Sequence, residues 1–200
     1  MTELSLLAEA LLAVEGTEST EASAVTREHL QTMAWLALEL GAALGGGLRR
    51  FAELSVELGD SRLAERLLDL PLRLGSAGET DAGLAIARAF EFLGPDKLRG
   101  DAAVILAQAG RRDEAVARIA ENLERAADTT LAEAKAGDAY RALGEDDAAE
   151  AYYRRSLSEA KTPFERSEAV LRIVSLLSDA GREQDAARFL AEERQRAVKS

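Results

Sequence analysis

The chain has 200 residues, no cysteine, one histidine and a net charge of −11. This length suits one domain, or two small ones, and can bury a core without a disulfide or a metal. The lack of cysteine excludes disulfide scaffolds, cysteine-ligated metals and thiol nucleophiles, and a single histidine excludes multi-histidine metal sites. So acidic a surface disfavours nucleic acids and anionic membranes as partners.

Composition favours helices, since more than a third of the residues are alanine or leucine and only three are proline. The N-terminus has no basic segment of the kind that begins a secretory signal. The most apolar window, Ala34 to Leu44, contains Glu39 and is too short to span a bilayer. We therefore expect a cytoplasmic protein, and the excess of arginine over lysine suggests a bacterial source with a GC-rich genome.

Residues 1–24 differ from the rest of the chain and are expected to form a separate N-terminal element. Ser5 to Val14 reads as a short amphipathic helix, and Gly16 to Ser23 as a polar connector. The favoured interpretation is a helix that caps the first repeat of a helical domain over residues 25–200. A latch or docking peptide is the alternative.

The next helices are expected in pairs. The pattern predicts one pair from Leu30–Leu44 and Leu48–Leu58, separated by the Gly45-Gly46-Gly47 turn. A second pair is predicted from Asp60–Leu74 and Thr80–Leu93.

The turn of this second pair is assigned to Gly75-Ser76-Ala77-Gly78, and Gly75 lies 35 residues before Gly110. Pro71 falls inside the predicted first helix and should kink it or end it early, because proline lacks the backbone N–H that a helix needs.

The C-terminal half contains a clear repeat. Gly110, Gly144 and Gly181 each end an apolar helical stretch, and they are 34 and 37 residues apart. A small residue follows each glycine by five positions: Ala115, Ala149 and Ala186. A period of this length is typical of helical solenoids.

One segment, Ala136 to Tyr153, carries a recognisable motif. It contains Gly137-Asp138 with Tyr140 two positions on, Leu143-Gly144, Ala149, and Tyr153 four residues after that alanine. In this pattern the chain resembles the tetratricopeptide repeat family. The resemblance implies an all-α fold, a right-handed α-solenoid of antiparallel helix pairs, with about five pairs plus an N-terminal helix.

The signals for helix starts support these helix boundaries. Thr130 to Glu133 and Thr162 to Glu165 both read as capping boxes, the second with proline at the first helical position. Gly94-Pro95 reads as a stop followed by a new start.

No residue set predicts catalysis. His29 has no recognisable nucleophile or orienting partner nearby in sequence, and a catalytic histidine needs both. The clusters Glu145-Asp146-Asp147 and Glu192-Glu193 fall in helix first turns or on exposed faces, where acids complement the helix dipole. The Gly45-Gly46-Gly47 run lacks the lysine of a phosphate loop. We expect no enzyme, no metal and no cofactor.

The resemblance implies a binding function instead, because in this family the first helix of each repeat lines a concave face that holds a peptide or partner protein. The polar residues between the core positions of those helices are the candidates: Arg62, Arg66, Asp69, Arg73, Lys97, Asp101, Gln108, Lys135, Asp138, Arg141, Arg172, Ser175 and Asp179. This set is richer in bases than the whole chain, so an acidic peptide is one expected partner. The alternative is that these charges are merely solvated.

The sequence leaves two other functions open. Phe189, Leu190 and Ala191 on the last helix could pair two chains, so the protein is expected to be a monomer or a homodimer. A regulatory domain that binds a small ligand within the solenoid is the third possibility.

Overall fold

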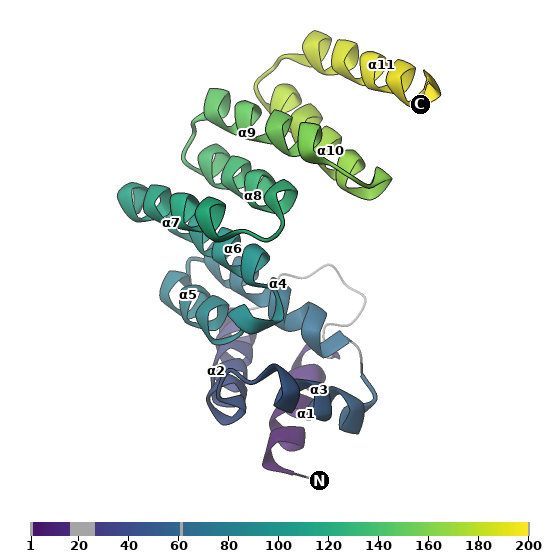
Figure 1. The fold of residues 1–200 in the computed structure, drawn as a ribbon. Helices are drawn as coiled ribbons and strands as arrows, with labels where there is room; N and C mark the ends of the chain where they lie inside the picture. Colours follow the sequence, from purple (N-terminus) through teal and green to yellow (C-terminus); the bar gives the residue numbers. More distant parts are fainter. Residues whose placement is uncertain (1, 17–26, 61, 200) are drawn as a thin grey trace.

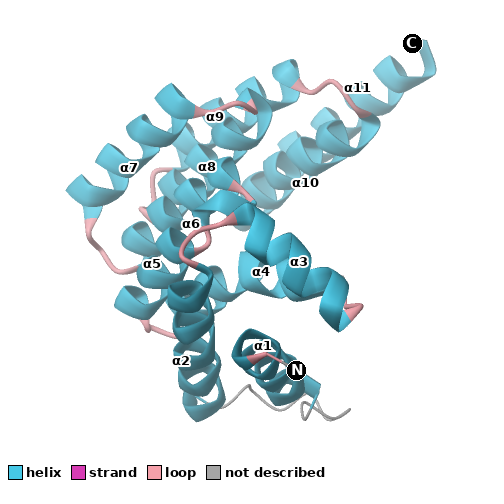
Figure 2. Ribbon diagram, turned by 60° about the horizontal axis from the view of Figure 1, so that its bottom comes forward, coloured by secondary structure: helices cyan, strands magenta, loops and turns pink. Residues whose placement is uncertain are grey.

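The computed structural model describes residues 2–16, 27–60 and 62–199, and these residues form helices and turns without a strand (Figures 1 and 2). The helices are α1 (Glu3–Gly16), α2 (Arg27–Leu44), α3 (Leu48–Leu58), α4 (Arg62–Ser76), α5 (Thr80–Ala89), the short 3-10 helix η1 (Glu91–Leu93), α6 (Pro95–Gln108), α7 (Arg112–Arg125), α8 (Thr129–Ala142), α9 (Asp146–Glu159), α10 (Pro163–Asp179) and α11 (Glu183–Lys199).

From α4 onward the chain is a stack of helix pairs: α4 with α5, α6 with α7, α8 with α9, and α10 with α11. The first helices α4, α6 and α8 pack directly on one another, and α10 joins the row mainly through α9. The second helices α5, α7 and α9 lie on the other side of the stack (Figure 1). The predicted all-α solenoid of helix pairs is confirmed, while its right-handed sense stays a prediction.

The repeat turns form where the glycine spacing places them. Gly110, Gly144 and Gly181 have φ of 72°, 76° and 70°, in the left-handed region that glycine enters without steric cost. In each case the next residue's N–H bonds back to the last turn of the helix, as Glu145 does to the carbonyl of Tyr140. The spacing of these glycines in the sequence therefore marks the turns within the C-terminal helix pairs.

Of the two predicted capping boxes, one is confirmed and one is wrong. The Thr162 side chain accepts from the Glu165 N–H, and the Glu165 carboxylate accepts from the Thr162 N–H. Helix α8 is instead capped two residues before Thr130, by Asp128, whose carboxylate accepts from the Leu131 N–H at 3.0 Å. Thr130 itself is buried inside the first turn.

The predicted pairing of Leu30–Leu44 with Leu48–Leu58 is not the packing found. Helix α2 lies against α1 and α5, and α3 packs against α1. The connector predicted over Gly16–Ser23 falls almost wholly outside the described residues. The division of the chain into residues 1–24 and 25–200 stays a prediction.

The turn predicted over Gly75–Gly78 is right at its second half and wrong at Gly75 and Ser76, which still belong to the helix. Helix α4 continues through Pro71 and Gly75 to Ser76, so the proline does not end it, and Ala77-Gly78 makes the turn. A Cβ on Gly75 would lie 2.7 Å from Cγ1 of Ile105 in α6. Gly75 is needed for close helix packing, which a sequence cannot distinguish from a turn. The second helix, predicted to reach Leu93, ends at Ala89 and is followed by η1.

The same need for a small residue recurs at the junction of α6 and α8. A Cβ on Gly100 would lie 2.5 Å from the Cβ of Lys135, an atom that cannot move without its backbone. Ala139 and Ala149, both fully buried, let α8 and α9 approach in the same way beside the buried Tyr153 ring. Small side chains therefore set the spacing of the stack.

We predict that Gly100→Ala lowers the free energy of unfolding by about 1–3 kcal/mol, the usual cost of overpacking, despite the better helix propensity of alanine. Gly41→Ala is the matched control, since its new Cβ would lie 3.1 Å from the Cβ of Ala89 instead of 2.5 Å from that of Lys135, so the backbone would have to shift by only a few tenths of an ångström. Urea unfolding measures both. A Gly100→Ala protein as stable as Gly41→Ala would contradict the packing described.

Candidate functional site

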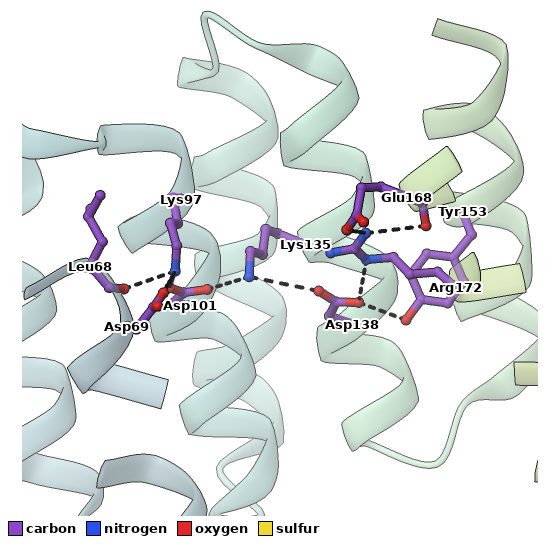
Figure 3. A network of polar contacts seen from close by, with 9 residues as sticks. All are labelled: Leu68, Asp69, Lys97, Asp101, Lys135, Asp138, Tyr153, Glu168 and Arg172. Atoms are coloured by element: carbon purple, nitrogen blue, oxygen red, sulfur yellow. Dashed lines mark hydrogen bonds and ion pairs between the residues drawn. The ribbon is translucent and has the colours of Figure 1, made fainter. Parts of the chain in front are cut away.

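A line of ion pairs crosses the first helices α4, α6, α8 and α10, the surface we call the first-helix face (Figure 3). Its centre is the carboxylate of Asp101 on α6, which is fully buried. Lys97 Nζ lies 2.8 Å from its Oδ2, and Lys135 Nζ of α8 lies 2.6 Å from its Oδ1. Lys97 also reaches α4, donating to the carbonyl of Leu68 at 2.9 Å and pairing with Asp69 at 3.3 Å.

The line continues from α8 to α10 through Asp138. Its carboxylate accepts from the Tyr153 hydroxyl at 2.8 Å and from Arg172 Nε at 3.2 Å, with Lys135 Nζ at 3.8 Å. Arg172 in turn pairs with Glu168 at 3.0 Å. We call Asp69, Lys97, Asp101, Lys135, Asp138, Arg172 and Glu168 the charge ladder.

Two groups at the ladder, the Tyr153 hydroxyl and the Arg172 guanidinium, have shifted pKa values. Burial, followed by the neighbouring Asp138 carboxylate, raises the pKa of the Tyr153 hydroxyl well above its ordinary value, so Tyr153 stays a hydrogen-bond donor. Burial alone would lower the pKa of Arg172, but Asp138 and Glu168 outweigh it and raise that pKa. Tyr153 is therefore neutral and Arg172 is charged at neutral pH.

A second cross-link and an open hollow lie beside the ladder. Arg141 on α8 donates to the Ser175 hydroxyl at 3.2 Å and pairs with Asp179, both on α10. Gln108 and Arg141 line a hollow of about 590 Å³ together with Val104, Asp138, Ala142 and Tyr153. Gln108 is exposed, so its amide is accessible from this hollow.

Ten of the thirteen residues predicted for the groove thus come together on one face. The other three lie apart from the ladder. Arg62 pairs locally with Asp60 at 2.7 Å, and Arg66 donates to the Leu12 carbonyl of α1 at 3.2 Å. Arg73 is half-buried in the last turn of α4.

The ion pairs of this face remove the excess of positive charge that the sequence predicted for it. Four carboxylates, of Asp69, Asp101, Asp138 and Glu168, face three cations along the ladder, and Arg141 is matched by Asp179. The excess of bases seen in the sequence is therefore neutralised within the face. It gives no support to the prediction of an acidic partner.

Two participants were missed from the sequence, Glu168 and Tyr153. A signal for the pairing was present, because Asp101 and Lys135 are 34 residues apart, and so are Asp138 and Arg172. Equivalent positions of successive repeats lie side by side in a solenoid, so opposite charges one period apart predict an ion pair.

A smaller hollow of about 270 Å³ lies between α8 and α10, with a more apolar lining. Its apolar lining comes from Leu131, Ala134, Ala169 and Phe164, and Phe164 is 74% exposed. The hollow is also lined by three acidic residues, Asp128, Glu165 and Glu168. A large apolar side chain of a partner would find contact here.

The residues considered for catalysis do not form a centre. His29 is exposed at the start of α2. Within the described ranges, no three histidine or acidic side chains are grouped so that they could hold a metal. Nor does any helix there have the length and apolar character needed to cross a membrane.

The prediction of a homodimer rested on three residues of the last helix, and the largest of them is buried within the chain. Phe189 is only 6% exposed and packs into the cluster of α9 and α10, with the Arg154 guanidinium 5.3 Å from its ring centre. Leu190 is half-buried and Ala191 is exposed. The last helix thus presents no large apolar patch from these three residues.

Comparison with known families gives one result. Residues 129–200, which are α8 to α11, match the family model described as "Tetratrico peptide repeat". The resemblance drawn from the sequence is confirmed over this part of the chain, which includes Lys135, Asp138, Arg141 and Arg172. Repeats of this family are typically non-catalytic modules for protein–protein interaction. No curated protein matches the chain.

We predict that Tyr153→Phe lowers the free energy of unfolding by about 1.5–3 kcal/mol, because Asp138 loses a buried donor to a charged group. Ser158→Ala is the control, since it removes an exposed hydroxyl that bonds only to the Arg155 carbonyl. Urea unfolding of both variants checks this. Equal stability of Tyr153→Phe and the parent would show that the hydroxyl does not support Asp138.

Proposed function

We propose that the protein is a non-catalytic interaction module, an adaptor or scaffold, that binds an extended segment of a partner protein on its first-helix face. The observation that carries the proposal is the hollow where Gln108 of α6 and Arg141 of α8 meet beside the ladder. The family match of α8 to α11 supports the same class of function.

The chemistry of the hollow suits a peptide backbone. The Gln108 amide offers a donor and an acceptor, the pair that one peptide group can satisfy. Arg141 uses one guanidinium nitrogen on α10, which leaves other N–H groups for a carbonyl or carboxylate of the partner. The apolar hollow around Phe164 would then take a large side chain of the same segment.

The ladder contributes rigidity to this face. Lys97, Lys135 and Arg172 are already held by two or more partners each, so binding need not freeze them. Side chains ordered in advance lower the entropic cost of association. In this proposal, recognition depends on hydrogen bonds and shape rather than on net positive charge. Cytoplasmic location and a bacterial source remain predictions from composition.

Selection of binders from a displayed random peptide library, followed by calorimetry with the selected peptides, tests the proposal. Arg141→Ala should raise the Kd about tenfold or more, since a charge-assisted hydrogen bond contributes about 1.5–3 kcal/mol. Gln108→Ala should also weaken binding, and Phe164→Ala should weaken peptides that carry a large apolar residue.

Arg188→Ala is the matched control, because it removes the same charge from the exposed side of α11. Melting temperatures of the free variants confirm folding. The proposal is rejected if no peptide is selected, or if the selected peptides bind the Arg141→Ala and Gln108→Ala proteins as well as the parent.

A further inference from the structure

A further cavity lies away from the first-helix face, between the second helices α5 and α7. It measures about 600 Å³, with α6 as its floor. Figure 1 shows α5 and α7 on the same side of the stack. The α5 wall carries the small side chains of Ala85, which is exposed, and Ala87, next to the larger Leu84 and Arg88.

Arginines close this cleft at both ends. At one end Arg111 bridges the two walls, pairing with Asp81 of α5 at 3.4 Å and Glu114 of α7 at 2.6 Å. At the other end the buried Arg99 of α6 pairs with Glu91 at 2.9 Å and Asp96 at 2.6 Å. The cleft is therefore bounded along its length, unlike a groove through which a polypeptide could pass.

The walls of the cleft carry unbalanced positive charge. Arg88 on α5 has no ion-pair partner among the described residues. Arg118 and Arg125 on α7 share a single carboxylate, that of Glu121, with one nitrogen of each at 2.7 Å. Three guanidinium groups thus face one carboxylate in a protein whose net charge is −11.

The arrangement on α7 is regular. Glu114, Arg118, Glu121 and Arg125 follow one another at helical spacing, so a single face of the helix forms the charged wall. Below them the floor is apolar, with Leu98, Ala102 and Leu106 of α6. Lys97, Asp101 and Gln108 lie on another face of the same helix, so this cleft is independent of the proposed peptide site.

We infer that this cleft binds a small organic anion with two or more carboxylate or phosphate groups. Arg118 and Arg125 each donate to Glu121 from one terminal nitrogen. Their remaining N–H groups, with those of Arg88, can bind the carboxylate or phosphate groups of the anion through paired hydrogen bonds. The volume falls in the range of small-molecule sites, and the apolar floor can contact a carbon skeleton.

Calorimetric titration of the full chain with citrate and with pyrophosphate tests this inference and separates the two sources of anionic groups. At least one of them should bind saturably with one site per chain. Arg88→Ala/Arg118→Ala should weaken that binding at least tenfold. Arg49→Ala/Arg188→Ala, which removes two exposed charges elsewhere, should bind as the parent does.

A second variant, Ala85→Phe, fills the cleft without changing its charge and should also abolish binding, with the free protein's melting temperature as the folding check. Binding of citrate alone identifies a site for polycarboxylates, binding of pyrophosphate alone a site for phosphate groups, and binding of both a general anion site. The inference is overturned if neither binds more tightly than about 1 mM. It is also overturned if the control double variant loses binding equally.

Discussion

The buried carboxylate of Asp101 is the constraint on which the stack depends. A charge without solvent is tolerated only when opposite charges replace the water. Asp101 has two, Lys97 of its own helix, which also donates a hydrogen bond, and Lys135 of the next helix, which forms an ion pair. Gly100, the neighbouring residue, lets α8 come close enough for Lys135 to reach. Helix spacing and charge pairing therefore fix the same register between α6 and α8.

This constraint also shapes what the surface offers to a partner. Because every cation of the ladder is paired with carboxylates, the first-helix face presents ordered polar groups such as Gln108 and Arg141 without an excess of positive charge. Unbalanced cations instead gather around Arg88 in the cleft between α5 and α7. The two helix rows of one solenoid thus present different chemistry, one suited to hydrogen bonding and the other to anions.

The sequence predicted the C-terminal pairs well because their turns need a left-handed residue, and Gly110, Gly144 and Gly181 recur with the period. It failed where glycine has a packing role, as at Gly75, since close approach depends on a helix far along the chain. Most of the predicted groove residues do gather on one face. Their mutual neutralisation was missed because each helix was considered alone, although Asp101 and Lys135 are one period apart.

A double-mutant cycle between Asp101 and Lys135, measured by urea unfolding, tests the central claim most directly. Asp101→Leu and Lys135→Met each leave a buried charge with a lost partner, and each should cost about 3 kcal/mol or more. The double variant removes both charges together, and should lose at least about 2 kcal/mol less than the sum of the single losses. Losses that simply add would show that this pair does not hold α6 against α8.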